Sequence, residues 1–465
     1  MKKISALLSV FALACTVSAE TYTDSMQWKA YDDFNDVFLD KKKYIYRDYS
    51  DRENAVDRWG GAAAIWCQAI YFDMAVNAYN RAAREGDDTR ARKYKTLARS
   101  IYNGEKSQYV SFNFDDPNTN TGWFVYDDIM WWTGALARAY EAFGIREYLT
   151  LSEKSFCRVW YGSVKVGDDG SYADPSRFSG KYGGGMFWEW QPIDSPDPHK
   201  EGDFRAACIN FPTVIAACYL HQLVPEGRKA VTSAHPTRQT KEWYLEKAKE
   251  VYEWASTTLV RSGRVADGIH GGDPEFTDHL YNQATYIGAS CMLYKITGET
   301  KYRTNAIAGA RYVFNTMCRR NGGYLPLETG VEQGVYAAIF AQYMHMLVYD
   351  LEQTSYLTTI KKNLQQAWDN RDTVRGISNG NFRKATTSDE QVESYTGSAL
   401  PALMLMFPAG DSQTAIRSYT ADADKDLSDV YTVDGKLIMK DASIDQVNAL
   451  DSGLYIYQKR KFLKR

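Results

Sequence analysis

The segment Gly122-Trp123-Phe124-Val125-Tyr126-Asp127-Asp128-Ile129-Met130-Trp131-Trp132 places two adjacent carboxylates among five aromatic side chains. An apolar run with helical spacing, residues 133–143, follows directly. This run predicts a buried helix that begins close to the two aspartates. We therefore expect the segment to join the core of the fold to a polar centre at the start of a helix.

Helix capping is the plainer interpretation of the two aspartates. Asp is favoured at the N-cap and in the first turn of a helix, and Asp-Asp pairs recur elsewhere in the chain. Those at 87–88, 115–116 and 168–169 lie in polar, turn-like connectors, and the pair at 32–33 lies on a predicted surface helix. Only the pair at 127–128 combines dense aromatics with the start of an apolar helix.

Helical periodicity continues along the chain on both sides of this segment. Apolar residues recur at three- and four-residue spacing. They predict twelve helices, at residues 24–42, 61–84, 89–109, 127–143, 146–160, 207–223, 240–260, 281–297, 300–318, 332–351, 354–368 and 393–407.

The even-numbered helices of this series are apolar on nearly all sides, whereas odd-numbered ones such as 240–260 keep a polar stripe. A helix that is apolar all round is buried, and one with a polar stripe faces water. The alternation predicts an all-α (α/α)6 toroid of six helical hairpins, with an inner ring of helices inside an outer ring. An open superhelical solenoid is the alternative, although no fixed repeat length supports it.

In such a toroid the N-terminal ends of parallel inner helices meet at one mouth. The residues expected there are Asp127-Asp128, Asn210, Tyr281-Asn282-Gln283, Glu332-Gln333 and Glu393-Ser394-Tyr395. Each could be a simple helix cap, but together they place polar and aromatic groups at one opening.

This composition suits carbohydrate chemistry, because aromatic faces stack on sugar rings and a carboxyl pair hydrolyses glycosidic bonds. The candidates for stacking are Trp123, Tyr126, Trp131, Trp132 and Trp188. Tyr281, Asn210, Asn282 and Gln283 complete the candidate substrate-binding set. Trp131 and Trp132 point about 100° apart on a helix, so at most one of them can face a sugar.

A long connector, residues 161–205, lacks helical pattern and contains Gly183-Gly184-Gly185-Met186-Phe187-Trp188-Glu189-Trp190. A connector of this length inside a compact domain is usually functional. We expect an aromatic loop over the mouth; a loop that buries its own aromatics is the alternative.

The N-terminus has the pattern of a secretory signal, residues 1–19. Lys2 and Lys3 precede a short apolar region, and Val17-Ser18-Ala19 forms a small-residue cleavage site. The apolar region is too short to span a membrane. Cys15 fits a lipoprotein signal poorly. An exported protein, found in the periplasm, at the cell surface or outside the cell, is expected.

After residue 410 the sequence changes character. Residues 411–426 are polar, and short β-type runs follow at 429–433, 436–439 and 453–458. The first two flank Asp434-Gly435, a favoured hairpin turn. We therefore expect three parts: the signal, a helical catalytic domain over 20–410, and a linker with a small β appendage over 411–465. The appendage resembles the C-terminal sorting domains of secreted Bacteroidota proteins.

Composition excludes several classes of function. The net charge of −3 and the scattered charges argue against nucleic-acid binding. The six cysteines of the mature chain lie in apolar helical patterns, which favours buried free thiols over metal ligands. No Ser-His-Asp signature is visible, no cofactor or metal is implied, and a monomer is expected.

These motifs resemble glycoside hydrolase family 76, the α-1,6-mannanases, over roughly residues 28–407. The resemblance is carried by Gly122-Trp123, Tyr126-Asp127-Asp128 and Trp131-Trp132, by Gly183-Gly184-Gly185-Met186-Phe187-Trp188, by Ala207-Cys208-Ile209-Asn210 and by Tyr281-Asn282-Gln283. It implies endo-acting hydrolysis of α-1,6-linked mannan with retention, Asp127 being the nucleophile and Asp128 the acid/base. Two stretches depart from the usual family pattern: the sequence of residues 183–188, and Phe211-Pro212 after Asn210.

The spacing of the pair is consistent with retention. Retaining enzymes hold their carboxyl groups about 5–5.5 Å apart and inverting ones about 6.5–9.5 Å. Consecutive Cα atoms lie about 3.8 Å apart, so neighbouring aspartates fit the shorter distance more readily. A transglycosylase or a lyase on the same toroid, or a non-catalytic glycan-binding protein, remains an alternative.

Overall fold

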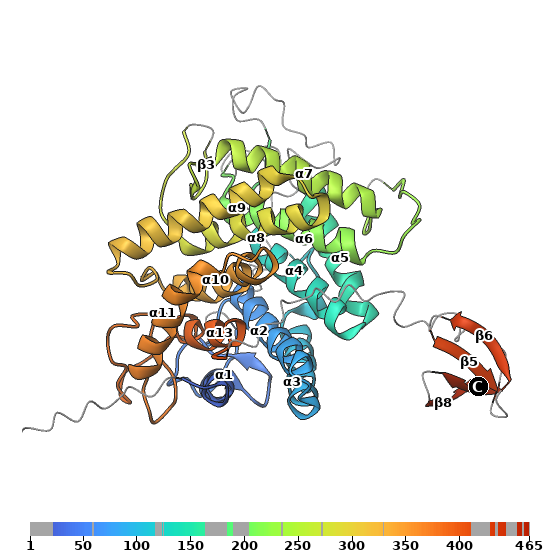
Figure 1. Cartoon of the computed structure of the whole chain (residues 1–465), viewed down its shortest axis with the longest axis horizontal. Coiled ribbons are helices and arrows are strands. Elements are labelled where there is room, and N and C mark those ends of the chain that lie inside the picture. Colours follow the sequence, from blue (N-terminus) through green and yellow to red (C-terminus); the bar gives the residue numbers. More distant parts are fainter. Residues whose placement is uncertain are drawn as a thin grey trace, which may run out of the picture.

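The computed structural model describes residues 22–57, 60–116, 123, 125–162, 184–188, 204–233, 236–270, 273–328, 330–410, 428–432, 436–442, 453–457 and 460–464. Helices dominate this part of the chain and form a closed double ring (Figure 1). The expected signal, residues 1–19, lies outside it.

Six helices form the inner ring: α2 (Ile65–Arg84), α4 (Tyr126–Phe143), α6 (Ala207–Leu223), α8 (Leu280–Thr297), α10 (Tyr336–His345) and α13 (Ala399–Met406). Each packs on the next, and α13 packs back on α2. Most of their side chains are buried, as the all-round apolar pattern requires. The closed circle confirms the toroid, since an open solenoid would leave its first and last helices unpaired.

Six further helices form the outer ring: α1 (Asp24–Phe38), α3 (Asp88–Gln108), α5 (Arg146–Gly162), α7 (Lys241–Thr258), α9 (Thr300–Tyr312) and α11 (Leu357–Asp369). Of these outer helices, α3, α5, α7 and α9 each pack on the inner helix that precedes them in the sequence, and α1 packs on α13. Short segments extend several helices: η3 (Val313–Cys318), η4 (Glu332–Val335), η5 (Met346–Asp350), η6 (Thr354–Tyr356) and α12 (Ser394–Gly397).

The first helix is shorter than its pattern predicts. It ends at Phe38 instead of residue 42, because β1 (Leu39–Asp40) turns back to pair with β2 (Ile45–Tyr46). A second short hairpin joins β3 (Val260–Arg261) to β4 (Arg264–Val265). Strands of two residues are too short to show an alternating pattern, so the sequence gives no sign of them.

Contacts between the two ends of the helical body close the ring. Arg81, on α2, is 1% exposed and donates hydrogen bonds to the carbonyl of Met404 (2.9 Å) and to Gln27 Oε1 (3.1 Å). Gln27 in turn donates to the carbonyl of Phe407 (2.8 Å). Residues far apart in the sequence thus share one buried polar network.

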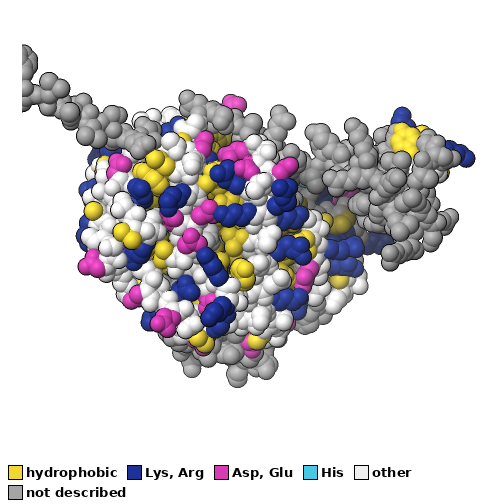
Figure 2. Space-filling view, turned by 90° about the horizontal axis from the view of Figure 1, so that it is seen from below, with side chains coloured by type: hydrophobic (Ala, Val, Ile, Leu, Met, Phe, Trp, Pro, Cys, Tyr) yellow, Lys and Arg dark blue, Asp and Glu magenta, His cyan; other side chains and the backbone are white. Residues whose placement is uncertain are grey.

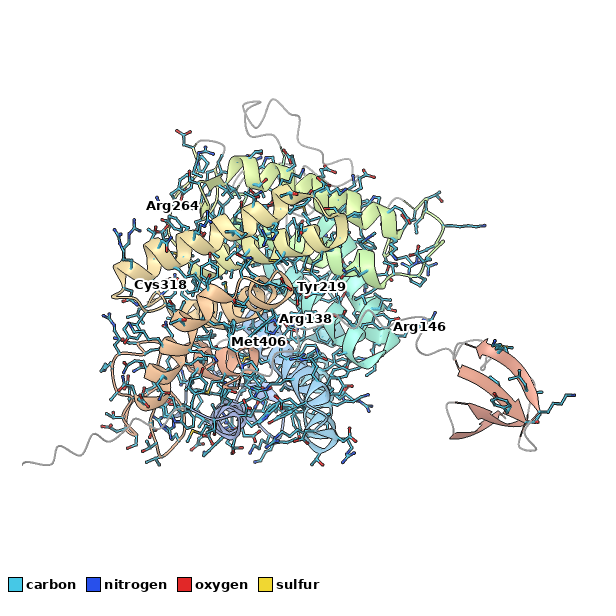
Figure 3. The ribbon with its side chains drawn as sticks, viewed as in Figure 1. Arg138, Arg146, Tyr219, Arg264, Cys318 and Met406 are labelled. Carbon is cyan, nitrogen blue, oxygen red and sulfur yellow. The ribbon has the colours of Figure 1, made fainter. Side chains whose placement is uncertain are left out.

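The axis of the toroid is also polar. Arg138, on α4, donates to the Asp73 carboxylate and to the Asn77 side chain on α2. Asn77 donates to Gln342 Oε1 on α10 (2.8 Å). Figure 3 shows Arg138 and Tyr219 near the middle of the ring, beside Met406. Small cavities next to this network, lined in part by Trp131 and Tyr343, have room for about one water molecule each.

The small β appendage is a four-stranded antiparallel sheet in the order β6-β5-β7-β8, formed by β5 (Ser428–Thr432), β6 (Leu437–Ala442), β7 (Gly453–Tyr457) and β8 (Arg460–Lys464). In Figure 1 it stands apart from the helices. The expected turn at Asp434-Gly435 lies outside the described residues. A sorting role for this sheet stays a prediction.

The surface of the helical body carries mixed charges. On the face seen in Figure 2, Lys and Arg side chains alternate with Asp and Glu, with no large area of one sign. No helix in the described part of the chain is both long and apolar enough to span a membrane. Cys67, Cys157, Cys208, Cys218, Cys291 and Cys318 are buried, and none of them forms a disulfide within the described residues, as their apolar surroundings predict.

The buried carboxyl of Glu105, on α3, makes stability depend on pH. Within the described structure neither of its oxygens has a hydrogen-bond partner, and burial raises its pKa well above the ordinary value of 4.5. The unfolded chain loses this proton near its ordinary pKa while the folded protein keeps it. Each pH unit above about 4.5 therefore destabilises the fold by up to about 1.4 kcal/mol, until the folded-state pKa is reached.

We predict that Glu105→Gln removes this pH dependence. In urea unfolding between pH 5 and pH 8, the variant should gain stability relative to wild type as the pH rises. Glu242→Gln, at an exposed position on α7, is the matched control for loss of one carboxylate. A Glu105→Gln curve parallel to wild type at every pH would contradict the prediction.

Candidate functional site

The first turns of the inner helices meet at one mouth, as the toroid requires. Asp127 and Asp128 lie in the first turn of α4, next to Cys208 on α6 and Tyr281 on α8. The N-cap of α4 is Val125, in extended conformation, and no side chain caps the helix. The aspartates are therefore not caps, and the positive end of the helix dipole favours their negative charge.

Asp127 is 8% exposed, and burial raises the pKa of its carboxyl to about 7. Four donors oppose this effect: the Cys208 thiol, the backbone N–H groups of Asp128 and of Asp127 itself, and the Trp188 side chain. The Asp128 nitrogen lies 3.1 Å from Asp127 Oδ1. Hydrogen bonds to the charged form lower a carboxyl pKa, so this acid can change its charge near neutral pH.

Trp188 reaches Asp127 because its backbone is fixed on both sides. Its carbonyl accepts the Tyr126 N–H (2.8 Å) and its N–H donates to the Phe204 carbonyl (3.0 Å). The Trp188 ring is half-buried and packs edge-on against Phe204. Trp188, in the described segment 184–188 of the connector, therefore lies beside Asp127 and hydrogen-bonds its carboxylate.

The glycines before Trp188 have a packing role. Gly184 and Gly185 have φ values of +132° and +77°, and a Cβ on either would lie within 2.5 Å of the Trp254 ring. Arg205 packs over this ring (5.3 Å) and donates to the Gly184 carbonyl (2.7 Å). Only glycine allows this approach. Gly183, Glu189 and Trp190 lie outside the described residues.

An aromatic wall, formed by Trp66, Trp131, Tyr281 and Tyr336, lines the mouth beside the aspartates. Tyr281 and Tyr336 stack face to face with ring centroids 3.8 Å apart, and Trp66 lies 6.0 Å from Trp131 and 6.4 Å from Tyr336. Each ring is 4–8% exposed. Glu332 accepts a hydrogen bond from Trp66 Nε1 (2.7 Å), which links α2 to the segment before α10.

Three aromatic residues of the predicted substrate-binding set lie in the core. Trp123 is fully buried among Phe112, Phe114 and Tyr109. Tyr126 donates its hydroxyl to the Gly162 carbonyl, and Trp132 donates its indole N–H to the Ile65 carbonyl (2.9 Å). These contacts fix the start of α4, whereas Trp131, which is 4% exposed, packs against Trp66.

The predicted amides are also fully buried and hold backbone segments around the mouth. Asn210 bonds both the N–H (2.8 Å) and the carbonyl (3.1 Å) of Met186. Asn282 donates to Asp267 Oδ1 (2.9 Å). Gln283, with its amide suitably oriented, pairs with Gly263 and Val265 of the β3–β4 hairpin. Their contacts position the site, and binding of sugar by these residues stays a prediction.

Sequence reasoning did not single out Trp66, Cys208 and Tyr336 as functional residues. All three lie at the start of inner helices. The sequence pattern predicts that Cys208 is another buried thiol and that Trp66 and Tyr336 are core aromatics. Their shared position in the first turn of an inner helix is the signal that could have found them.

Within the described residues no group of His, Cys, Asp and Glu has an arrangement suited to a metal ion. The mouth instead combines a pair of adjacent carboxyls, one with a raised pKa, with aromatic faces. Chemically this suits acid–base and nucleophilic attack on a polar, ring-shaped substrate.

We predict opposite effects of alanine at two glycines. Gly185→Ala should destabilise the protein by about 2–4 kcal/mol, because the methyl group meets Trp254 and Ala disfavours the left-handed conformation. Gly134→Ala is the control, since its Cβ would meet nothing within 4 Å in the middle of α4. It should stabilise the helix by about 1 kcal/mol. Calorimetric unfolding checks both, and equal shifts would contradict the packing of the 184–188 loop.

Several solved structures share this fold. The α-1,6-mannanase GH76A of Salegentibacter sp. HEL1_6 is 21% identical, with a TM-score of 0.63, and the match covers 82% of this chain and 98% of that one. The Lin0763 protein of Listeria innocua is 20% identical (TM-score 0.65; 82% and 96% covered). The family 76 mannosidase Bt3792 of Bacteroides thetaiotaomicron VPI-5482 is 16% identical (TM-score 0.62; 83% and 98% covered).

At such identities these likenesses establish the shared fold. A comparison with curated protein sequences gives no significant match. The sequence model of the family named glycosyl hydrolase family 76, however, matches residues 19–409, which is most of the chain. This protein therefore belongs to glycosyl hydrolase family 76.

Proposed function

We propose that this glycoside hydrolase is a secreted, endo-acting enzyme that cleaves α-1,6-mannosidic linkages in mannan with retention. The observation that carries the proposal is the adjacent pair Asp127-Asp128 in the first turn of an inner helix, beside an aromatic wall. Asp127 is assigned as nucleophile and Asp128 as acid/base.

A fold relative supports the assignment. In the Salegentibacter mannanase, variants with two adjacent aspartates replaced are described as inactive, and they were solved with α-1,6-mannotetrose and α-1,6-mannotriose. This chain has one such pair at the start of its inner helix α4. The distance argument for neighbouring carboxyls points the same way, toward retention.

The reaction has two steps. Asp127 Oδ attacks the anomeric carbon while the protonated Asp128 gives its proton to the departing glycosidic oxygen, so a covalent mannosyl–aspartyl ester forms. Asp128, now a carboxylate, then takes a proton from water, whose oxygen attacks the same carbon and releases Asp127. Two inversions at one carbon retain the configuration.

The surroundings of Asp127 suit a nucleophile that also serves as a leaving group. Trp188, Cys208 and the Asp128 N–H donate to its carboxylate, which orients it and stabilises its negative charge. The start of α4 adds the favourable helix dipole. Removing any of these donors should make the carboxylate harder to form.

The aromatic wall and Trp188 are the proposed contacts for mannose rings. The rings of the wall are 4–8% exposed, whereas Trp123, Tyr126 and Trp132 are fully buried. Export of the enzyme is proposed from the signal pattern at residues 1–19. A polysaccharide substrate outside the cell is consistent with such export.

We predict that wild type releases short manno-oligosaccharides from debranched yeast α-1,6-mannan. Asp127→Ala and Asp128→Ala should each lower kcat by about 10³-fold or more, because each removes one partner of the carboxyl pair. Chromatography of the products, with NMR of the first anomer formed, checks both the linkage and retention. Asp73→Asn, in the axial network, is a matched control for loss of one buried carboxylate.

Other products would identify the alternatives. Chains longer than the substrate indicate a transglycosylase, and an unsaturated sugar that absorbs in the ultraviolet indicates a lyase. Retained binding of mannan without turnover by wild type would indicate a glycan-binding protein and contradict the proposal.

The raised pKa of Asp127 predicts an acidic limb in the pH profile. A nucleophile must be ionised, so kcat/KM should fall about tenfold for each pH unit below about pH 7. Initial rates between pH 4.5 and pH 9 measure the limb, which reports the carboxyl pair as a unit. Activity that stays high to pH 5 and falls only above pH 7 would instead make Asp127 the acid.

A further inference from the structure

Three short segments lie side by side next to the start of α4: residues 184–188, 204–207 and 266–270. The Tyr126 N–H donates to the Trp188 carbonyl (2.8 Å), and the Trp188 N–H donates to the Phe204 carbonyl (3.0 Å). Since Tyr126 directly precedes Asp127, this row of backbone begins beside the aspartate pair.

The second and third segments pair in antiparallel fashion. The Arg205 N–H donates to the Ile269 carbonyl (3.0 Å), and the Ala207 N–H donates to the Asp267 carbonyl (2.7 Å). In this register position 204 stands opposite position 270. Because successive side chains of an extended segment alternate between its two sides, the register also decides which side chains share a side.

Three aromatic rings share the outer side of these segments. The Phe204 and His270 rings stack with centroids 4.3 Å apart and an interplanar angle of 19°, and the Trp188 ring meets Phe204 edge-on at 6.1 Å. Trp188 and Phe204 are half-buried, and His270 is exposed. The side chains that alternate with these three are at most 1% exposed: Phe187, Arg205 and Ile269. An outer aromatic row, Trp188–Phe204–His270, therefore leads from the aspartate pair to the surface.

Gly268 makes room for this row. A Cβ on this residue would lie 2.3 Å from Phe204 Cε2 and 3.0 Å from the Ala206 Cα. Glycine in an extended segment often marks a place where another group approaches closely. The Phe204 ring therefore occupies the space that a side chain at position 268 would fill, and His270 stacks on this ring.

We propose that His270 binds a further sugar unit of the mannan chain, on a surface that begins at Trp188, and that Phe204 is a positioning residue that holds the two rings in a row. His270 offers a flat face for stacking and ring nitrogens that can bond a hydroxyl. Packing alone does not require the outermost ring to be exposed. The inference rests on the proposed function and adds a binding surface outside the aromatic wall.

Four variants test this surface. His270→Ala removes the outer ring, and His270→Tyr keeps a flat ring that can bond a hydroxyl. Phe204→Leu keeps apolar volume without the flat support, and Gly268→Ala pushes the Phe204 ring out of its place. Phe314→Leu is the matched control, because Phe314 is also half-buried and stacks on Tyr356 (4.7 Å), in a segment that continues the outer helix α9.

The variants are assayed on α-1,6-manno-oligosaccharides of increasing length and on debranched yeast α-1,6-mannan. His270→Ala should lower kcat/KM for the polymer by about three- to tenfold, through a higher KM, since one aromatic stacking contact is lost. The loss should grow with chain length. Phe204→Leu and Gly268→Ala should show the same length dependence, and His270→Tyr should stay near wild type. A loss in His270→Ala that is equal at every length, no loss on the polymer, or the same length dependence in Phe314→Leu overturns the inference.

Affinity electrophoresis separates failure of this inference from failure of the proposed function. Native gels contain α-1,6-mannan, xylan or a β-glucan, and slower migration of the full chain with Asp127→Ala reports binding without cleavage. If wild type cleaves mannan and His270→Ala changes neither the kinetics nor the migration, the proposed function stands and the inference is overturned. If wild type leaves mannan intact, the proposed function is wrong. The inference of a glycan surface is then supported where one polysaccharide slows the chain with His270 more than the chain with His270→Ala, and overturned where none does.

Discussion

The contact that closes the inner ring is the constraint on which the rest of the structure depends. α13 must return to α2, and the buried Arg81 secures this contact by bonding both the Met404 carbonyl and Gln27 near the N-terminus. Once the circle is closed, the inner helices are forced to present their first turns at the same opening. Asp127, Cys208, Tyr281 and Tyr336 come from four successive hairpins, and closure of the ring adds Trp66, on α2, to the same opening.

The mouth resolves a conflict between burial and charge. A carboxyl taken out of water resists ionisation, yet Asp127 has to be ionised to act as the proposed nucleophile. Here the donors to Asp127 come from its own helix, from α6 and from the 184–188 loop. These donors, from separate elements of the fold, lower the pKa that burial raises. Gly184 and Gly185 contribute indirectly, because their close approach to Trp254 determines where Trp188 can lie.

Much of this arrangement was predictable. The alternation of all-round apolar and striped helices predicts the toroid, because burial demands it, and the dense aromatics around Asp127 single out that pair from the other Asp-Asp dipeptides. The roles of individual aromatics were not predictable in the same way. A tryptophan that fills the core, such as Trp123 or Trp132, and one that reaches the mouth, such as Trp131, require the same large flat side chain. Likewise, the role of Cys208 depends on neighbours from other helices, and the local spacing of residues does not reveal those neighbours.

The axial network has a consequence for how a polymer can be handled. Arg138, Asp73, Asn77 and Gln342 join α4, α2 and α10 across the centre of the ring, and Tyr219 and Tyr343 line the small spaces beside them. Across the described residues, the hole in the toroid is therefore plugged at mid-height. A polysaccharide chain therefore cannot pass through the centre of the ring. Under the proposed function, a polysaccharide would lie across one open end, be cut there and leave by the same side, so each further cut would require release and rebinding.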